Sequence, residues 1–141
     1  MFYKTKLLGL LIAAELCCST AIAQSTLYSE LGGNSGLTKI VADAIKRWEQ
    51  NPVLAEQFKN ADTERLEKTL VQQFCALTGG GCKYEGGDMK TVHEKMGVTT
   101  HQFNALAEEL QNALTENGIA SSVQNRLVAL LAPMKRDVVT K

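Results

Sequence analysis

The sequence contains few of the side chains that usually bind metal ions. It has two histidines, His93 and His101, and four cysteines among 141 residues. No two cysteines are spaced as CxxC, which excludes a thioredoxin-type redox site, and no group of cysteines has the spacing of a zinc site. A metal held by this chain would therefore depend on a single imidazole.

The sequence also lacks an excess of charge of either sign. It has 15 basic and 15 acidic residues, and the basic residues are scattered rather than gathered in a stripe or interleaved with aromatic residues. This pattern argues against binding to nucleic acid or to an anionic membrane surface. No continuous apolar run approaches the length of about 20 residues that a spanning helix needs, so we expect no stable membrane insertion.

The first 23 residues have the features of an export signal. Lys4 and Lys6 precede an apolar run over residues 7–14, and residues 21–23 (Ala-Ile-Ala) form a small-x-small cleavage site. We therefore expect cleavage before Gln24 and export to the periplasm or the medium.

A lipid anchor on Cys17 or Cys18 is the alternative, although the residues that precede them, Leu16 and Cys17, are not the small residue of a typical lipoprotein signal. Cleavage of the signal takes away two lysines and one glutamate, which leaves 118 residues with 13 basic and 14 acidic side chains. This length predicts one domain, residues 24–141, with a single hydrophobic core.

Cys75 and Cys82 remain after cleavage, and six residues separate them. In an oxidising compartment such a pair can close a small loop, so we predict a disulfide. The alternative is that Cys75 is a small apolar core residue, as free cysteines often are.

Apolar residues recur at steps of three and four along most of the chain, which predicts amphipathic helices. No alternation is long enough for a strand, so the expected fold class is all-α. Pro133 lies inside the last helical pattern and should bend it. The expected helices run from Asn34 or Ser35 to Asn51, from Asp62 or Thr63 to Gly79, from Thr99 (in a capping box with Gln102) to Asn117, and from Ser121 or Ser122 through Met134.

His93 lies in a long segment, residues 79–97, that interrupts this helical pattern. A short helix there would place His93 on one face with Met89, Val92 and Met96. One nitrogen ligand among apolar side chains suits a flat, apolar ring that carries iron. The alternative is an ordinary hydrogen-bonded histidine in the core or at the surface.

A set of residues along nearly all of the mature chain has a characteristic order and spacing: Leu27 to Gly33, Phe58, Gly79-Gly80, Tyr84, Gly86, Met89 to His93, Gly97 to Thr99, Phe103, Ala132-Pro133 and Asp137-Val138. In this order and spacing the sequence resembles the group 1 truncated haemoglobins. The resemblance implies a two-over-two helical sandwich that holds haem b, with His93 as the proximal ligand of the iron. His101 has no assigned role.

The resemblance also implies which side chains touch the haem, although any of them could instead be ordinary core residues. Besides His93, the implied haem contacts are Phe58, Leu66, Leu70, Phe74, Met89, Val92, Met96, Val98 and Phe103.

The distal pocket, opposite His93, departs from the family. Many relatives have a tyrosine on the first long helix, and alignment places Ile45 there, with Leu66, Thr69 and Leu70 along the distal helix. Bound oxygen carries partial negative charge, and a hydrogen bond to a charged group contributes about 1.5–3 kcal/mol. An apolar distal pocket should therefore release oxygen at least about tenfold faster. Thr69, Gln73 and Tyr84 are the remaining polar candidates.

We therefore expect a monomeric, exported haem protein that binds oxygen, nitric oxide or carbon monoxide reversibly, with an electron donor that the sequence does not identify. The alternative is a haem enzyme, a nitric oxide dioxygenase or peroxidase, against which stands the lack of a distal acid or base. A haem-free helical interaction module is the third possibility. Lys68 and Met134 could supply a second iron ligand, but their spacing does not single them out.

Overall fold

The computed structural model describes residues 25–141, and the predicted signal lies outside this range. Within it the chain forms helices and no strands. The helices are α1 (Leu27–Glu30), α2 (Gly33–Gln50), α3 (Ala55–Phe58), α4 (Thr63–Leu77), α5 (Met89–His93), α6 (Thr100–Glu116), α7 (Ser121–Leu131), the 3₁₀ helix η1 (Ala132–Met134) and α8 (Lys135–Val138).

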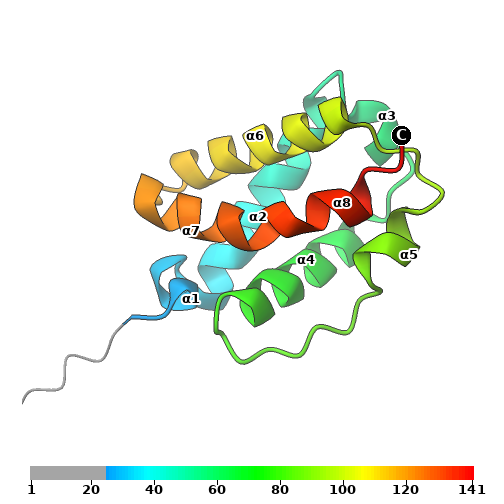
Figure 1. Cartoon of the computed structure of the whole chain (residues 1–141). Coiled ribbons are helices and arrows are strands. Elements are labelled where there is room, and N and C mark those ends of the chain that lie inside the picture. Colours follow the sequence, from blue (N-terminus) through cyan, green and yellow to red (C-terminus); the bar gives the residue numbers. More distant parts are fainter. Residues whose placement is uncertain (1–24) are drawn as a thin grey trace, which may run out of the picture.

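The long helices pack as two pairs. Helix α2 contacts α4 on one side and α6 on the other, and α6 contacts α7. In Figure 1, α7, η1 and α8 form one nearly continuous rod that runs beside α6, and the short α5 lies beside α8. This arrangement confirms the predicted all-α, two-over-two sandwich. None of the helices in the described part is long and apolar enough to cross a membrane.

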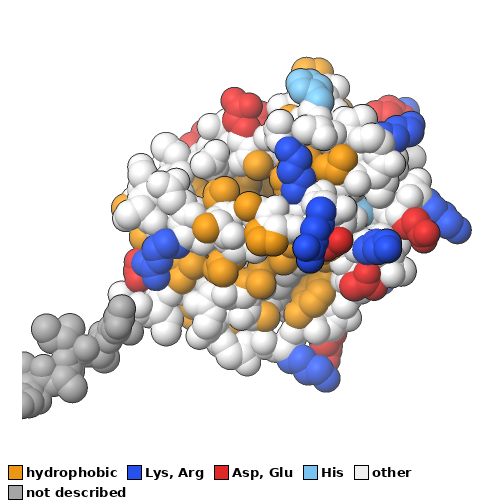
Figure 2. Space-filling view, in the orientation of Figure 1, with side chains coloured by type: hydrophobic (Ala, Val, Ile, Leu, Met, Phe, Trp, Pro, Cys, Tyr) orange, Lys and Arg blue, Asp and Glu red, His pale blue; other side chains and the backbone are white. Residues whose placement is uncertain are grey.

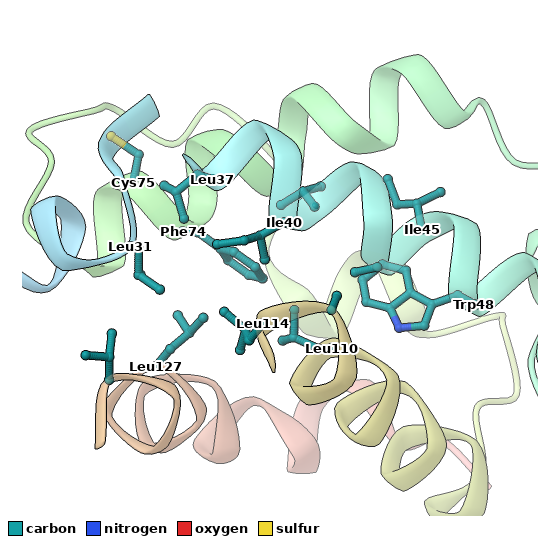
Figure 3. Packing of buried hydrophobic residues seen from close by; sticks show 14 of the residues in the cluster. Leu31, Leu37, Ile40, Ile45, Trp48, Phe74, Cys75, Leu110, Leu114 and Leu127 are labelled. Atoms are coloured by element: carbon teal, nitrogen blue, oxygen red, sulfur yellow. The ribbon is translucent and has the colours of Figure 1, made fainter. Parts of the chain in front are cut away.

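The core lies where these pairs meet, because each long helix turns one apolar face inward. Figure 3 shows Leu37 and Ile40 of α2, Phe74 of α4 and Leu114 of α6 converging. At one end of α2, the Trp48 ring stacks on Phe58 with 5.5 Å between centroids, and its Nε1 donates a hydrogen bond to the Leu106 carbonyl at 3.1 Å. These contacts hold α2, α3 and α6 together.

Local capping chemistry explains where two of the long helices begin. Asp62 accepts a hydrogen bond from the Arg65 amide, and Thr99 forms the predicted capping box with Gln102. Helix α2 begins earlier than predicted, at Gly33 rather than after Asn34 or Ser35. Its N-cap is Gly32, whose φ of 85° favours a residue without a side chain.

The short helix that carries His93 is shorter than the sequence predicts. Helix α5 ends at His93 and does not reach Met96, because the Met96 amide donates to the His93 carbonyl in a tight turn instead of continuing the helix. At the other end of the chain, Pro133 converts the last helix into η1 between α7 and α8, as expected for a residue without an amide hydrogen.

Candidate functional site

His93 has a fixed ring orientation. Its Nδ1 lies 2.8 Å from the carbonyl oxygen of Met89, one turn earlier in α5. Since a carbonyl oxygen only accepts hydrogen bonds, Nδ1 carries the hydrogen and the neutral ring keeps a lone pair on Nε2. Histidines that bind metals are commonly held in this way, by a second hydrogen bond that fixes the tautomer. The half-buried His93 is therefore prepared to donate one nitrogen lone pair.

Helix α5 carries His93 but has little packing of its own. It has five residues and none of them is buried. Its first turn is capped by Asp88, which accepts a hydrogen bond from the Thr91 amide at 2.9 Å. Hydrogen bonds from Thr91 lower the pKa of the Asp88 carboxyl, so the cap is charged at neutral pH. The signal for this cap, an aspartate directly before the helix, was present in the sequence.

Two positions in the expected haem contacts are unusually exposed for large apolar residues. Val92 is 45% and Met96 is 43% exposed, whereas Met89 and Phe103 are half-buried and Val98 is buried. Figure 2 shows apolar side chains gathered in the middle of one face, over α4 and the α7–α8 rod, with charged side chains around them. The chain thus leaves apolar surface uncovered close to its one candidate ligand.

One face of helix α4 contacts α5. Leu66, Leu70 and Gln73 follow one another at steps of four and three, so they share one face of the helix. The Gln73 amide nitrogen lies 3.6 Å from the sulfur of Met89, which joins this face to α5. We refer to Leu66, Leu70, Gln73, Met89 and His93 as the α4–α5 face.

Other expected contact residues belong to the core. Ile45 and Phe74 are 2% and 3% exposed, and Phe58 packs against the same core through Trp48. Ile45, which the sequence analysis places in the distal pocket, thus carries only hydrocarbon. The structure links Gln73 to Met89 and Met89 to His93, whereas Ile45 and Phe74 belong to the core cluster and Phe58, Leu66 and Leu70 pack against it.

The remaining polar candidates for a distal hydrogen bond already have partners. The Thr69 hydroxyl donates to the Arg65 carbonyl at 2.8 Å, within its own helix. The Tyr84 hydroxyl donates to the Gly87 carbonyl at 2.9 Å, in the loop before α5. Burial raises the pKa of Tyr84, so this phenol stays protonated at neutral pH. Neither hydroxyl is free to serve a ligand opposite His93.

Gln73 is a functional candidate that the sequence pattern identified only as a possible distal donor. Of the three buried polar residues in the described range, Thr78 and Gln124 donate to oxygen atoms, whereas the Gln73 amide contacts only the sulfurs of Met89 and Met134, at 3.6 and 3.8 Å. The amide therefore lies toward the helix that carries His93. No sequence signal marks this contact, because the partners are 16 and 61 residues away.

A hollow of about 580 Å³ lies on the other side of α4, between α4 and α2. Its α4 residues include Glu64, Glu67, Lys68 and Gln72, which face away from Leu66 and Gln73. Most of its lining side chains are polar or charged, and none of them belongs to α5. Lys68 therefore does not lie on the α4–α5 face, which removes it as a second ligand opposite His93.

Cys75, in the last turn of α4, lies next to Cys82, in the loop that leads to α5. Their Cα atoms are 5.6 Å apart and their sulfurs are at bonding distance, a geometry that permits the disulfide. Gly80 packs closely against the Cys75 sulfur and the Tyr28 ring, and a side chain there would collide with both. The disulfide stays a prediction that a chemical test must decide.

The described residues fit a flat apolar macrocycle better than a metal ion bound by protein alone. No group of three or more His, Cys, Asp or Glu side chains comes together in the part of the chain that the structure describes. One imidazole with a free Nε2 and a surrounding of leucine, methionine and valine side chains can instead bind a metal whose other ligands come from a ring.

Comparison with known proteins agrees with this geometry. The family model described as Bacterial-like globin matches residues 26–140. A group 1 truncated hemoglobin of Mycolicibacterium paratuberculosis is 30% identical over 116 residues, which cover 82% of this chain and 85% of the relative. A group 1 truncated hemoglobin of Synechocystis sp. is 31% identical over 126 residues, which cover 83% of this chain and 99% of the relative.

Solved structures have the same arrangement of helices. The crystal structure of the truncated hemoglobin of Tetrahymena pyriformis in its Fe(III) form is 26% identical, has a TM-score of 0.79, and is matched over 83% of this chain and all of that one. The 2/2 hemoglobin of Synechococcus sp. with covalently attached heme has a TM-score of 0.77 and is matched over 83% of this chain and all of that one. Because its sequence is only 22% identical, this second likeness shows the fold alone.

Proposed function

This chain belongs to the bacterial-like globin family, in which the standard cofactor is haem b, and we propose that it binds haem b through Nε2 of His93. The proposal depends on the hydrogen bond that Nδ1 of His93 donates to the Met89 carbonyl. This bond leaves the lone pair of Nε2 free to bind the iron. Leu66, Leu70 and the half-buried Met89 supply apolar contacts for the ring.

The bound haem would supply an iron atom with a position for a small ligand opposite His93. The chain's own residues make that side apolar: Ile45, Leu66 and Leu70 present hydrocarbon, and the Thr69 hydroxyl is held by its own helix. We therefore propose reversible binding of oxygen, nitric oxide or carbon monoxide, with weak discrimination in favour of oxygen.

The proposal includes export. Residues 1–23 lie outside the described range, so it depends on the sequence pattern of Lys4, Lys6, the apolar run and the Ala-Ile-Ala cleavage site. A periplasmic or secreted location would also suit the Cys75–Cys82 pair, because disulfides persist in oxidising compartments.

Absorbance after reconstitution with haem tests the proposed cofactor and ligand together. We expect a stoichiometric Soret band in the wild type and its loss or displacement in His93→Ala. His101→Ala is the matched control, because His101 is exposed in the first turn of α6 and should change nothing. The proposal would be refuted if the wild type gave no Soret band, or if His93→Ala gave the same band as the wild type.

A further inference from the structure

Gln73 is a buried amide in an otherwise apolar stripe. Its neighbours on the same face of α4 are Leu66, Leu70 and Leu77, and the residue itself is only 7% exposed. Buried polar groups normally pair with oxygen or nitrogen, and thioether sulfur is a weak acceptor. The position of this amide between the sulfurs of Met89 and Met134 therefore calls for an explanation other than stability.

The contact matters because α5 buries no residue of its own. Helix α5 packs on α8, and its Met89 side chain lies against Gln73 of α4. Met89 links the two sides. Its sulfur accepts a hydrogen bond from the Gln73 amide, and its carbonyl accepts one from Nδ1 of His93 at 2.8 Å. A continuous path thus runs from α4 through Met89 to the imidazole.

We propose that Gln73 is a positioning residue for His93, which clamps Met89 and, through the Met89 carbonyl, sets the orientation of the imidazole that binds the haem iron. The inference rests on the proposed function. By holding Met89 and Met134 at once, Gln73 ties α4 to both α5 and η1. Outer partners of metal-bound histidines typically change metal affinity about 10- to 100-fold when they are removed. Because Gln73 acts one contact further away, we expect an effect near the lower limit, about tenfold.

The test compares Gln73→Leu, Met89→Leu and the double variant, all loaded with haem. Leucine fits the apolar stripe and retains the side-chain volume, and Gln73→Met serves if the leucine variant does not fold. Gln72→Leu is the matched control, because Gln72 is a half-buried neighbour that lines the hollow on the other face of α4. The readouts are the iron–imidazole stretching band of the ferrous protein in resonance Raman spectra and the haem dissociation constant.

Each single variant should shift the iron–imidazole band and weaken haem binding about tenfold. The double variant should shift the band no further than the larger single change, because both residues act along one path. Gln72→Leu should match the wild type.

An unshifted band in Gln73→Leu or Gln73→Met, or additive shifts in the double variant, would overturn the inference while leaving the proposed function intact. A wild type without any iron–imidazole band would refute the proposed function, and the role of Gln73 with it.

Discussion

In the proposed haem complex, Ile45 would determine much of the chemistry opposite His93. Its buried side chain in α2 carries no hydroxyl, and the Thr69 hydroxyl donates to its own backbone. Carbon monoxide should lose less from an apolar wall than oxygen does, because it is the less polar ligand. Oxygen loses a stabilising hydrogen bond, so the two ligands should respond differently to a change at this position.

Ile45→Tyr should slow oxygen dissociation by about tenfold or more, because one hydrogen bond to a charged group contributes about 1.5–3 kcal/mol. Stopped-flow measurement of the oxygen dissociation rate tests this. Ile45→Phe adds the same ring without the hydroxyl and controls for overpacking of the core. Equal oxygen dissociation rates in the two variants would contradict the account of the distal side.

Asp88 gives the His93 helix a pH-sensitive cap. Because its pKa is lowered in the folded protein, the stability that it contributes is complete above the ordinary aspartate pKa of about 4 and is lost as the pH falls through the lower folded value. Asp88→Asn keeps a capping oxygen but does not titrate. The unfolding free energy of the wild type should therefore fall more steeply than that of Asp88→Asn below about pH 4, as measured by urea denaturation. Parallel curves would show that this cap does not contribute.

The helices with strong local signals were predictable from the sequence. Asp62 and the Thr99–Gln102 capping box mark helix starts through chemistry that spans three residues, and Pro133 marks a break through its missing amide hydrogen. Helix α2 starts before the predicted Asn34 or Ser35 because Gly32 adopts a left-handed conformation, which depends on the turn from α1.

Contacts between distant segments explain what the sequence did not reveal. The four-residue helices α1 and α8 are too short to show periodicity, and α8 packs against α5, which is distant in the sequence. His93 was predictable as a ligand candidate from its apolar neighbours. The clamp of Gln73 on Met89 and Met134 was not, because only the packing of α4 against α5 and η1 brings the three side chains together.

The loop between α4 and α5 should be fixed by the Cys75–Cys82 disulfide. Closing a loop of this size restricts the unfolded chain and contributes about 2–3 kcal/mol in the chain-entropy relation. Cys82→Ala should therefore have an unfolding free energy lower than that of the wild type by this amount. The wild type should show the same decrease in unfolding free energy when a reductant is added. A thiol reagent that labels Cys82 in the unreduced wild type would contradict the disulfide.

The mature protein should begin at Gln24. Expression of the full chain in a bacterium with an export pathway should yield, outside the cytoplasm, a protein whose intact mass corresponds to residues 24–141 less two hydrogens for the disulfide. A full-length mass would contradict cleavage, and a lipid-sized addition with Cys17 or Cys18 as the first residue would favour the lipoprotein alternative.

As a whole, the molecule is a two-over-two helical sandwich that offers one fixed imidazole and an apolar face to a ring-bound iron. The absorption spectrum of the ferrous haem-loaded protein, recorded before and after addition of carbon monoxide, tests this claim most directly. The account predicts a five-coordinate ferrous spectrum that changes completely on addition of carbon monoxide, and that is lost or displaced in His93→Ala. A protein that takes up no haem, or a six-coordinate spectrum that carbon monoxide does not alter, would contradict it.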